Sequence, residues 1–148
     1  MPTETPKEIE NMSIIKKTME ECWNSHNFSV VDEVFSQELV FHGPSIEFYS
    51  LEEFKSLQKS FSNAFTDTKI TPTFQFAKED IVVTHFIWEG THTGEMQGIL
   101  PTGKKVEMTG IEIDRLDHGI IMESWEEFDQ LGMMKQLGME VKPMEVAH

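Results

Sequence analysis

The stretch Gly90–Gly110 reads GTHTGEMQGILPTGKKVEMTG, and its spaced glycines and single proline decide how the middle of the chain folds. Pro101, Thr102 and Gly103 combine a fixed φ with a flexible position, which is what a reversing loop requires. The residues on either side can both form strands. The stretch therefore predicts two paired strands joined by this loop.

The N-terminal half shows a helical pattern. From Glu8 to about Asn24, apolar residues recur every three or four positions, which places them on one face of a helix. A short helical run follows Ser29, and Ser50 with Glu53 forms a capping box ahead of a third helix. We expect three helices here, with a short extended piece at 39–42 between the second and the third.

After Asp67 the content of threonine, valine, isoleucine and aromatic residues rises, which favours strands near 69–77, 80–93, 104–115 and 120–128. Asp117–Gly119 is typical of a tight hairpin turn between the last two strands. Asp129 then opens a short helix that Gly138 ends. Helices followed by consecutive hairpins predict an α+β fold with an antiparallel sheet.

Composition limits the possible partners. The chain has 148 residues, 39% of them hydrophobic, which suits one domain with its own core. Its formal net charge of −14 would repel phosphate backbones and anionic lipids, so we expect no nucleic acid and no membrane partner. The chain has no apolar run that could span a bilayer. The single cysteine, Cys22, and the absence of an N-terminal signal pattern favour a cytoplasmic location.

The run Gly90–Gly110, with the segment MESWEEFDQLGMMKQLG at Met122–Gly138, resembles the SnoaL-like polyketide cyclases, also called ester cyclases. These form a branch of the nuclear transport factor 2-like and ketosteroid isomerase-like superfamily, and the resemblance extends more weakly back to Trp23. It implies a cystatin-like α+β barrel, in which a curved antiparallel sheet wraps around the N-terminal helices as a cone with a deep pocket. We expect one such domain at 7–139, between flexible tails at 1–6 and 140–148.

The resemblance also implies the catalytic base. In the cyclases, an acidic residue on the last strand removes a proton from the carbon between two carbonyl groups, and the enolate then closes a ring. The matching position is Glu126, where family members carry aspartate. Strand alternation places Ser124 on the same face, with Trp125 and Glu127 on the other. In an apolar pocket the pKa of Glu126 should rise through desolvation.

Neighbouring carboxylates have competing interpretations. Glu112 and Asp114 match positions that place polar side chains beside the base in the cyclases. Asp114 adjoins Arg115 near a hairpin end, so we expect it in a surface ion pair. Asp129 suits a helix N-cap rather than a catalytic role. Glu123 and Glu127 are expected to be solvent-exposed strand residues.

Histidines and aromatic residues complete the candidate site. His42, which precedes Gly43–Pro44, and His92 could orient a carbonyl group or carry a proton, although a lone histidine in such a fold is more often a hydrogen-bonded structural residue. No pair of histidines has the spacing of metal ligands, so no metal site is expected. Trp23, Phe54 and Trp88 could line a substrate pocket or form the core.

We therefore expect a cofactor-independent enzyme of the SnoaL-like type, acting on a small hydrophobic carbonyl compound by acid–base chemistry. Its catalytic residues would be Glu126, Glu112 and His42. The substrate would be bound by Trp23, Phe54, Trp88, His92 and Ser124. The alternative is a non-catalytic module that binds a small hydrophobic ligand. The apolar alternation at 82–88 and the family resemblance both favour a homodimer formed through the sheet.

Overall fold

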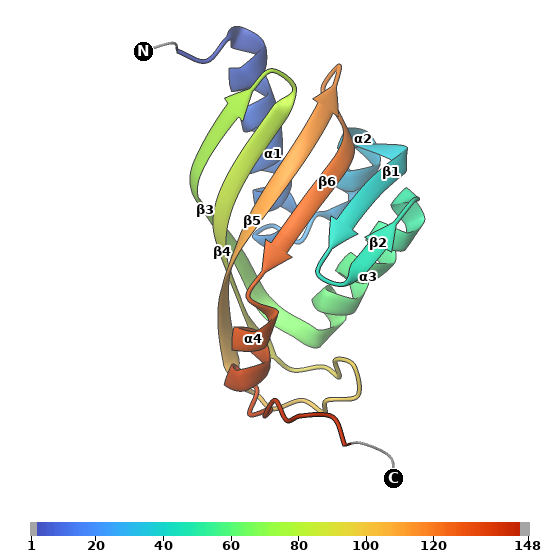
Figure 1. Ribbon diagram of the computed structural model, residues 1–148, viewed down its shortest axis with the longest axis vertical. Coiled ribbons are helices and arrows are strands. Elements are labelled where there is room, and N and C mark those ends of the chain that lie inside the picture. The colour runs from blue at the N-terminus through green and yellow to red at the C-terminus, as the bar shows by residue number, and fades with distance from the viewer. Residues whose placement is uncertain (1–2, 146–148) are drawn as a thin grey trace.

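The computed structural model describes residues 3–145, in which helices cover one face of a single curved, unclosed sheet (Figure 1). The elements follow in the order α1 (Pro6–Trp23), η1 (Phe28–Val30), α2 (Val31–Val34), β1 (Phe35–Gly43), β2 (Ile46–Phe48), α3 (Leu51–Ala64), β3 (Phe65–Lys78), β4 (Ile81–His92), β5 (Lys105–Asp117), β6 (Ile120–Phe128) and α4 (Gln130–Gln136). This order is the α+β arrangement that the sequence predicts. Residues 1–2 and 146–148, the outer parts of the predicted tails, lie outside the described residues.

The long helix α1 is defined at both ends by side chains. Thr5 and Glu8 form a capping box at its start, which satisfies two backbone N–H groups that have no partner within the helix. At its other end, the Asn24 side chain donates to the Ile70 carbonyl oxygen at 3.1 Å and accepts from the Ile70 N–H at 2.6 Å. The Thr68 hydroxyl donates to the Trp23 carbonyl oxygen at 2.9 Å. These bonds fasten α1 to β3.

The sheet has the strand order β2-β1-β6-β5-β4-β3. The predicted turn between β5 and β6 is confirmed, since His118 and Gly119 both have positive φ, 49° and 78°, as two-residue hairpin turns of type I′ require. Pairing is antiparallel throughout except between β1 and β6, which run parallel with Phe41 opposite Ser124. β6, the last strand of the chain, therefore lies inside the sheet, between the first strand β1 and β5.

The loop at 93–104 between β4 and β5 contains the predicted reversal. Gly103, with φ of 71°, donates its N–H to the His92 carbonyl oxygen at 2.8 Å, and the His92 N–H bonds back to Lys104 at 2.9 Å. At the start of the loop, the N–H groups of Thr93 and Gly94 both donate to the Ala64 carbonyl oxygen at 3.0 Å. The loop is therefore anchored on the C-terminal end of α3.

The two faces of the sheet differ in exposure. Along β4 the side chains alternate between buried and partly exposed, and the buried set includes Val82, Phe86 and Trp88. These point toward the helices, where α1 packs on β3 and β4 while α3 packs on β1 and β3. We call this side the inner face and the opposite side the outer face. The core, and any internal cavity, lies between the inner face and the two long helices.

Candidate active site

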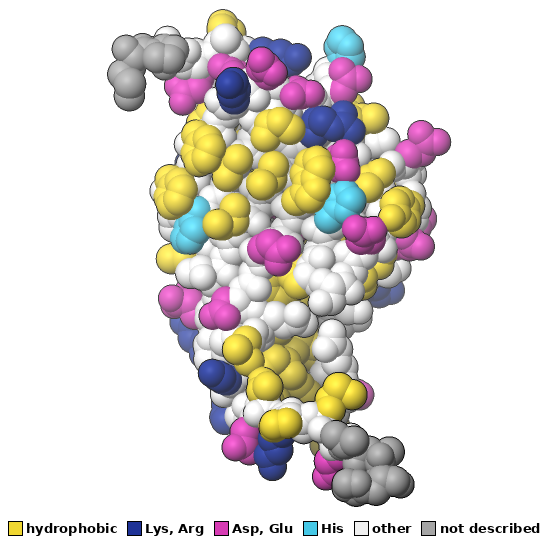
Figure 2. Space-filling model, viewed as in Figure 1, with side chains coloured by type: hydrophobic (Ala, Val, Ile, Leu, Met, Phe, Trp, Pro, Cys, Tyr) yellow, Lys and Arg dark blue, Asp and Glu magenta, His cyan; other side chains and the backbone are white. Residues whose placement is uncertain are grey.

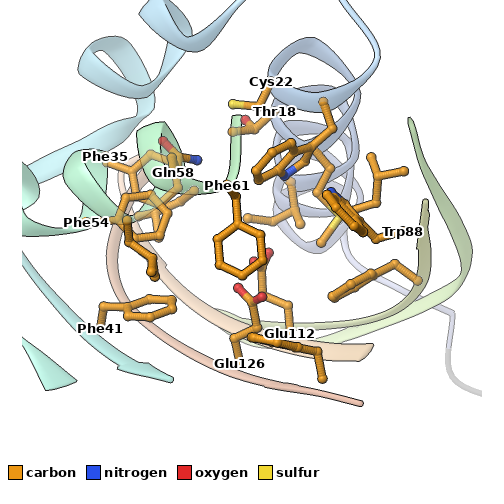
Figure 3. A pocket seen from close by; sticks show the side chains of 18 of the residues that line it. Thr18, Cys22, Phe35, Phe41, Phe54, Gln58, Phe61, Trp88, Glu112 and Glu126 are labelled. Carbon is orange, nitrogen blue, oxygen red and sulfur yellow. The ribbon is translucent and has the colours of Figure 1, made fainter. Parts of the chain in front are cut away.

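A cavity lies between the inner face and the helices α1 and α3 (Figure 3). It offers about 80 Å³ to the centre of a water molecule, several times what one buried water needs. Its walls are mainly aromatic and aliphatic, and the aromatic residues are Trp23, Phe35, Phe41, Phe54, Phe61, Phe86, Trp88 and Phe128. Such a lining excludes water from whatever the cavity holds and suits an apolar molecule.

The aromatic residues that the sequence proposes for substrate binding all line this cavity. Trp23 from α1 and Trp88 from β4 meet edge to face, with ring centroids 5.9 Å apart. Phe54 from α3 packs at 5.0 Å against Phe41 of β1. Helix periodicity identifies Trp23 and Phe54 as inward residues, whereas the contribution of Phe41 depends on the sheet register and was missed.

Two carboxylates stand on the sheet side of the cavity. Glu112 of β5 and Glu126 of β6 are direct cross-strand partners, and Figure 3 shows both side chains pointing from the sheet toward Phe61 of α3. The helices contribute Thr18, Cys22 and Gln58 as further polar groups. No lysine, arginine or histidine occurs among the lining residues within the described part of the chain.

Because no cation among the described residues lines the cavity, no positive charge offsets the rise in the pKa values of Glu112 and Glu126. Desolvation, followed by repulsion from Asp114 and Glu127, raises the pKa of Glu126 to about 7. Desolvation and the neighbouring charges of Asp114 and Glu126 raise the pKa of Glu112 well above its ordinary value. The pair therefore offers a neutral acid beside a group that is partly ionised near neutral pH, which is a combination suited to proton transfer.

Asp114 corrects the expectation of a surface ion pair. Its side chain is only 1% exposed, and its Oδ1 accepts a hydrogen bond of 2.6 Å from the Ser124 hydroxyl. Arg115 instead pairs with Glu123 on the outer face, with 3.5 Å between nitrogen and oxygen. The sequence contained the signal, because Asp114 lies two residues from Glu112 and therefore shares its face. Ser124 bonds to Asp114 and does not line the cavity.

His42 does not reach the cavity. It lies opposite Trp125 in the β1–β6 register and stacks on the Trp125 ring on the outer face, with centroids 5.3 Å apart. Its Nε2 lies 2.8 Å from Glu123 and its Nδ1 lies 3.0 Å from Glu47. The hydrogen bonds that the His42 ring donates to these two carboxylates, the one to Glu123 first, raise the pKa of His42. Glu123, which the sequence predicted to be solvent-exposed, is therefore hydrogen-bonded to His42 and only 24% exposed.

His92 is fully buried and also lies outside the cavity lining. Its Nδ1 accepts the Thr102 N–H at 3.2 Å, and the Thr102 hydroxyl lies 3.0 Å away. The ring packs against Phe65 with centroids 5.4 Å apart. In this position His92 holds the two ends of the β4–β5 loop together. Asp129 is the N-cap of α4, accepting the Gly132 N–H at 2.9 Å, as the sequence predicts.

Within residues 3–145, no three His, Cys, Asp or Glu side chains are placed to hold a metal ion together. No helix of that range is both long and apolar enough to cross a membrane.

The raised pKa of Glu126 leads to a prediction about folding. Glu126 is protonated in the folded chain between about pH 4.5 and about pH 7, where its unfolded counterpart is ionised, so raising the pH through this window favours unfolding. Replacing Glu126 with Gln removes this loss, which is on the order of 3 kcal/mol. Urea unfolding should show Glu126→Gln gaining stability over the wild type from about pH 5 to about pH 8. A difference independent of pH would contradict the shifted pKa.

Comparisons with known proteins identify the family and the fold. Residues 13–137 match the family model of the SnoaL-like polyketide cyclases. No match is found among curated protein sequences.

Among solved structures, AclR of Streptomyces galilaeus, described as a proposed hydroxylase, is 25% identical, with 88% of this chain and 96% of that chain covered and a TM-score of 0.80. IdmH of Streptomyces antibioticus, a proposed polyketide cyclase, is 26% identical with 87% and 99% covered and a TM-score of 0.76. A proposed SnoaL-like polyketide cyclase from Jannaschia has the same fold, at 17% identity, 95% and 100% coverage and a TM-score of 0.86. Because the family model spans most of the chain, this protein belongs to the SnoaL-like polyketide cyclase family.

Proposed function

We propose that this protein is a cofactor-independent acid–base enzyme of the cyclase type, acting on a small hydrophobic carbonyl compound held in the cavity. The observation that carries the proposal is the cross-strand pair Glu112 and Glu126 in a cavity whose walls are mainly apolar. Family membership and the similarity to IdmH, described as a proposed polyketide cyclase, support the same class of reaction.

In the proposed reaction, the Glu126 carboxylate removes a proton from a carbon next to a carbonyl group, and the electrons of that C–H bond form an enolate. The enolate carbon then attacks a second carbonyl carbon of the same molecule, so that one C–C bond closes a ring. The resulting alkoxide takes back the proton from Glu126, which balances the step without a cofactor. A base with a pKa near that of the surrounding solution is well suited to both transfers.

The other lining groups take supporting roles in this proposal. Glu112 presents a neutral carboxyl group to the substrate oxygen that becomes negative. Trp23, Phe54 and Trp88 hold the apolar part of the substrate and exclude water, which strengthens the electrostatic interactions inside the cavity.

The alternative is a module that binds a small hydrophobic molecule without changing it, and the predominance of aromatic residues in the lining favours it. The two functions are separated with 2-tetralone, a hydrophobic ketone with activated C1 hydrogens. Enzyme-catalysed exchange of these hydrogens in D₂O, followed by ¹H NMR, supports the acid–base proposal. Quenching of Trp23 and Trp88 fluorescence without faster exchange supports binding alone; the Trp125→Phe background removes the tryptophan outside the cavity.

We also propose that two copies of the chain pair through the outer face of the sheet. Figure 2 shows hydrophobic side chains gathered on this face. Phe74, Phe76 and Ile111 are 59%, 54% and 46% exposed, which is unusual for residues in the interior of strands. Burial of such a patch between copies would remove it from water. The charge of −14 opposes association, but screening over about 8 Å at physiological salt limits this repulsion.

A charge placed on this face should separate the copies. We expect the wild type to sediment as a dimer and Ile111→Lys to sediment as a 17.1 kDa monomer, because an ammonium group would be buried without a partner. Ile9→Lys is the matched control, since Ile9 is 57% exposed on α1 and lies away from the sheet face. Wild-type protein sedimenting as a monomer at micromolar concentration would refute the proposed dimer.

A further inference from the structure

Asp114 and Ser124 form a second cross-strand pair next to the pair Glu112 and Glu126, and together these four residues are called the array. In the β5–β6 register Glu112 faces Glu126, and two residues along the strands Asp114 faces Ser124. All four side chains therefore project from the inner face. Only the two glutamates line the cavity, while Asp114 and Ser124 are 1% and 2% exposed.

The hydrogen bonds of Asp114 indicate which of the neighbouring carboxyl groups carries a proton. Ser124 donates to Oδ1 of Asp114, whereas no donor among the described residues reaches Oδ2 when the neighbouring carboxyl groups are ionised. A buried carboxylate oxygen without a donor is destabilising, because no hydrogen bond replaces its lost hydration. Glu112 lies two residues from Asp114 on the same face of β5, and its interaction with Asp114 contributes to its raised pKa. Glu112 can satisfy this oxygen only if it carries a proton.

We infer that Asp114, braced by Ser124, is a positioning residue that keeps a proton on Glu112 and thereby leaves Glu126 as the base of the cavity. The aspartate is the better site for the negative charge, because the Ser124 hydroxyl stabilises its ionised form. Glu112 then enters the reaction neutral, and its O–H turns from Asp114 to the substrate oxygen when that oxygen becomes negative.

The charge on Asp114 also acts on Glu126. Repulsion from Asp114 contributes, after desolvation, to the raised pKa of Glu126. The remaining groups that face the array are Thr18 and Cys22 of α1, Gln58 of α3 and Thr84 of β4, none of them a cation. Arg115 and Glu123 point to the outer face and pair with each other. Asp114 is therefore the dominant charge that Glu126 meets within the sheet.

The test is a ¹³C NMR titration of the side-chain carboxyl groups in the whole chain, with Glu112 and Glu126 assigned from the missing signals in Glu112→Gln and Glu126→Gln. In Asp114→Asn we expect the titration midpoint of Glu126 to fall by about one pH unit, and Glu112 to begin titrating in the neutral range. Asp117→Asn makes the same chemical change at a 63% exposed position of β5 and should move neither midpoint. Unchanged midpoints in Asp114→Asn would overturn the inference.

Ser124→Ala provides a second variant in case Asp114→Asn does not fold. It keeps every carboxyl group but removes the donor to Asp114, so the Asp114 midpoint should rise from about 6. An unchanged Asp114 midpoint would also overturn the inference.

The effect of Asp114 on the reaction rests on the proposed function of Glu126 as the base, whereas the charge arrangement does not. If Glu126 is the base, Asp114→Asn also shifts the low-pH limb of the exchange rate with 2-tetralone toward lower pH by the same amount. If no exchange occurs in any variant, the proposed function fails, while the titration midpoints still decide the charge arrangement.

Discussion

Glu126→Gln is expected to reduce the rate of C1 hydrogen exchange in 2-tetralone by about 1000-fold relative to the wild type, within the range that general bases contribute. Glutamine has nearly the same shape and can keep the contacts of the cavity wall, but it cannot accept a proton at neutral pH. The affinity for the ketone, measured by tryptophan fluorescence, should change little. Rates are compared by ¹H NMR in D₂O at equal occupancy of the cavity.

Two further variants test whether the rate depends on the position of the Glu126 carboxylate or only on a negative charge on β6. Glu123→Gln removes a carboxylate on the opposite face of the same strand and should leave exchange within about twofold, because Glu123 does not line the cavity. Glu126→Asp restores the carboxylate about 1 Å further from the substrate and should recover only part of the rate, since such misplacement can cost about 100-fold. Full activity in Glu126→Gln would remove Glu126 from the mechanism.

Gly94→Ala is expected to destabilise the fold by about 3 kcal/mol, which corresponds to a fall in Tm of about 10 °C for a chain of this size. A Cβ at this position would overlap the backbone carbonyl oxygen of Asn63 and lie 3.2 Å from the Ala64 Cα. Both contacts are with the backbone at the end of α3, which cannot turn aside as a side chain can. The substitution must therefore push the β4–β5 loop away from α3 and strain the bonds from Thr93 and Gly94 to Ala64.

Gly98→Ala is the matched control in the same loop. Gly98 has φ of 83°, so alanine there meets conformational strain of about 1 kcal/mol, but no atom lies within 4 Å of the added Cβ. Thermal unfolding followed by circular dichroism should rank the variants as wild type, Gly98→Ala and Gly94→Ala. Equal losses for both variants would show that close packing on α3 is not what requires glycine at position 94.

The fold was predictable because its signals are local. Helix periodicity, the capping residue Ser50 and the turn at His118–Gly119 each act within a few residues of the chain. The inward direction of Glu112 and Glu126 also follows from a local rule, the alternation of side chains along a strand. Asp114 obeys that rule as well, but its neighbour in sequence, Arg115, suggested an ion pair, although successive side chains of a strand point to opposite faces.

The remaining features of the site depend on contacts between distant parts of the chain. His42 lies on the outer face because β1 pairs in parallel with β6, which places it opposite Trp125, and nothing near His42 in the sequence specifies this register. Whether Trp23, Phe54 and Trp88 form a solid core or surround a cavity depends on how far α1 and α3 stand from the sheet. Empty volume is a property of the assembled helices and sheet, and no single segment encodes it.

The wall of the cavity also contains the only sulfhydryl group of the chain. Cys22 is 2% exposed, and burial raises the pKa of its thiol to about 12, so an alkylating reagent must enter the cavity and meets almost no thiolate there. The speed of alkylation thus measures how often the interior opens, and any molecule that occupies the interior slows it. The alkylation rate of Cys22 therefore reports whether the cavity is occupied, and it can be used to screen a library of compounds for binding.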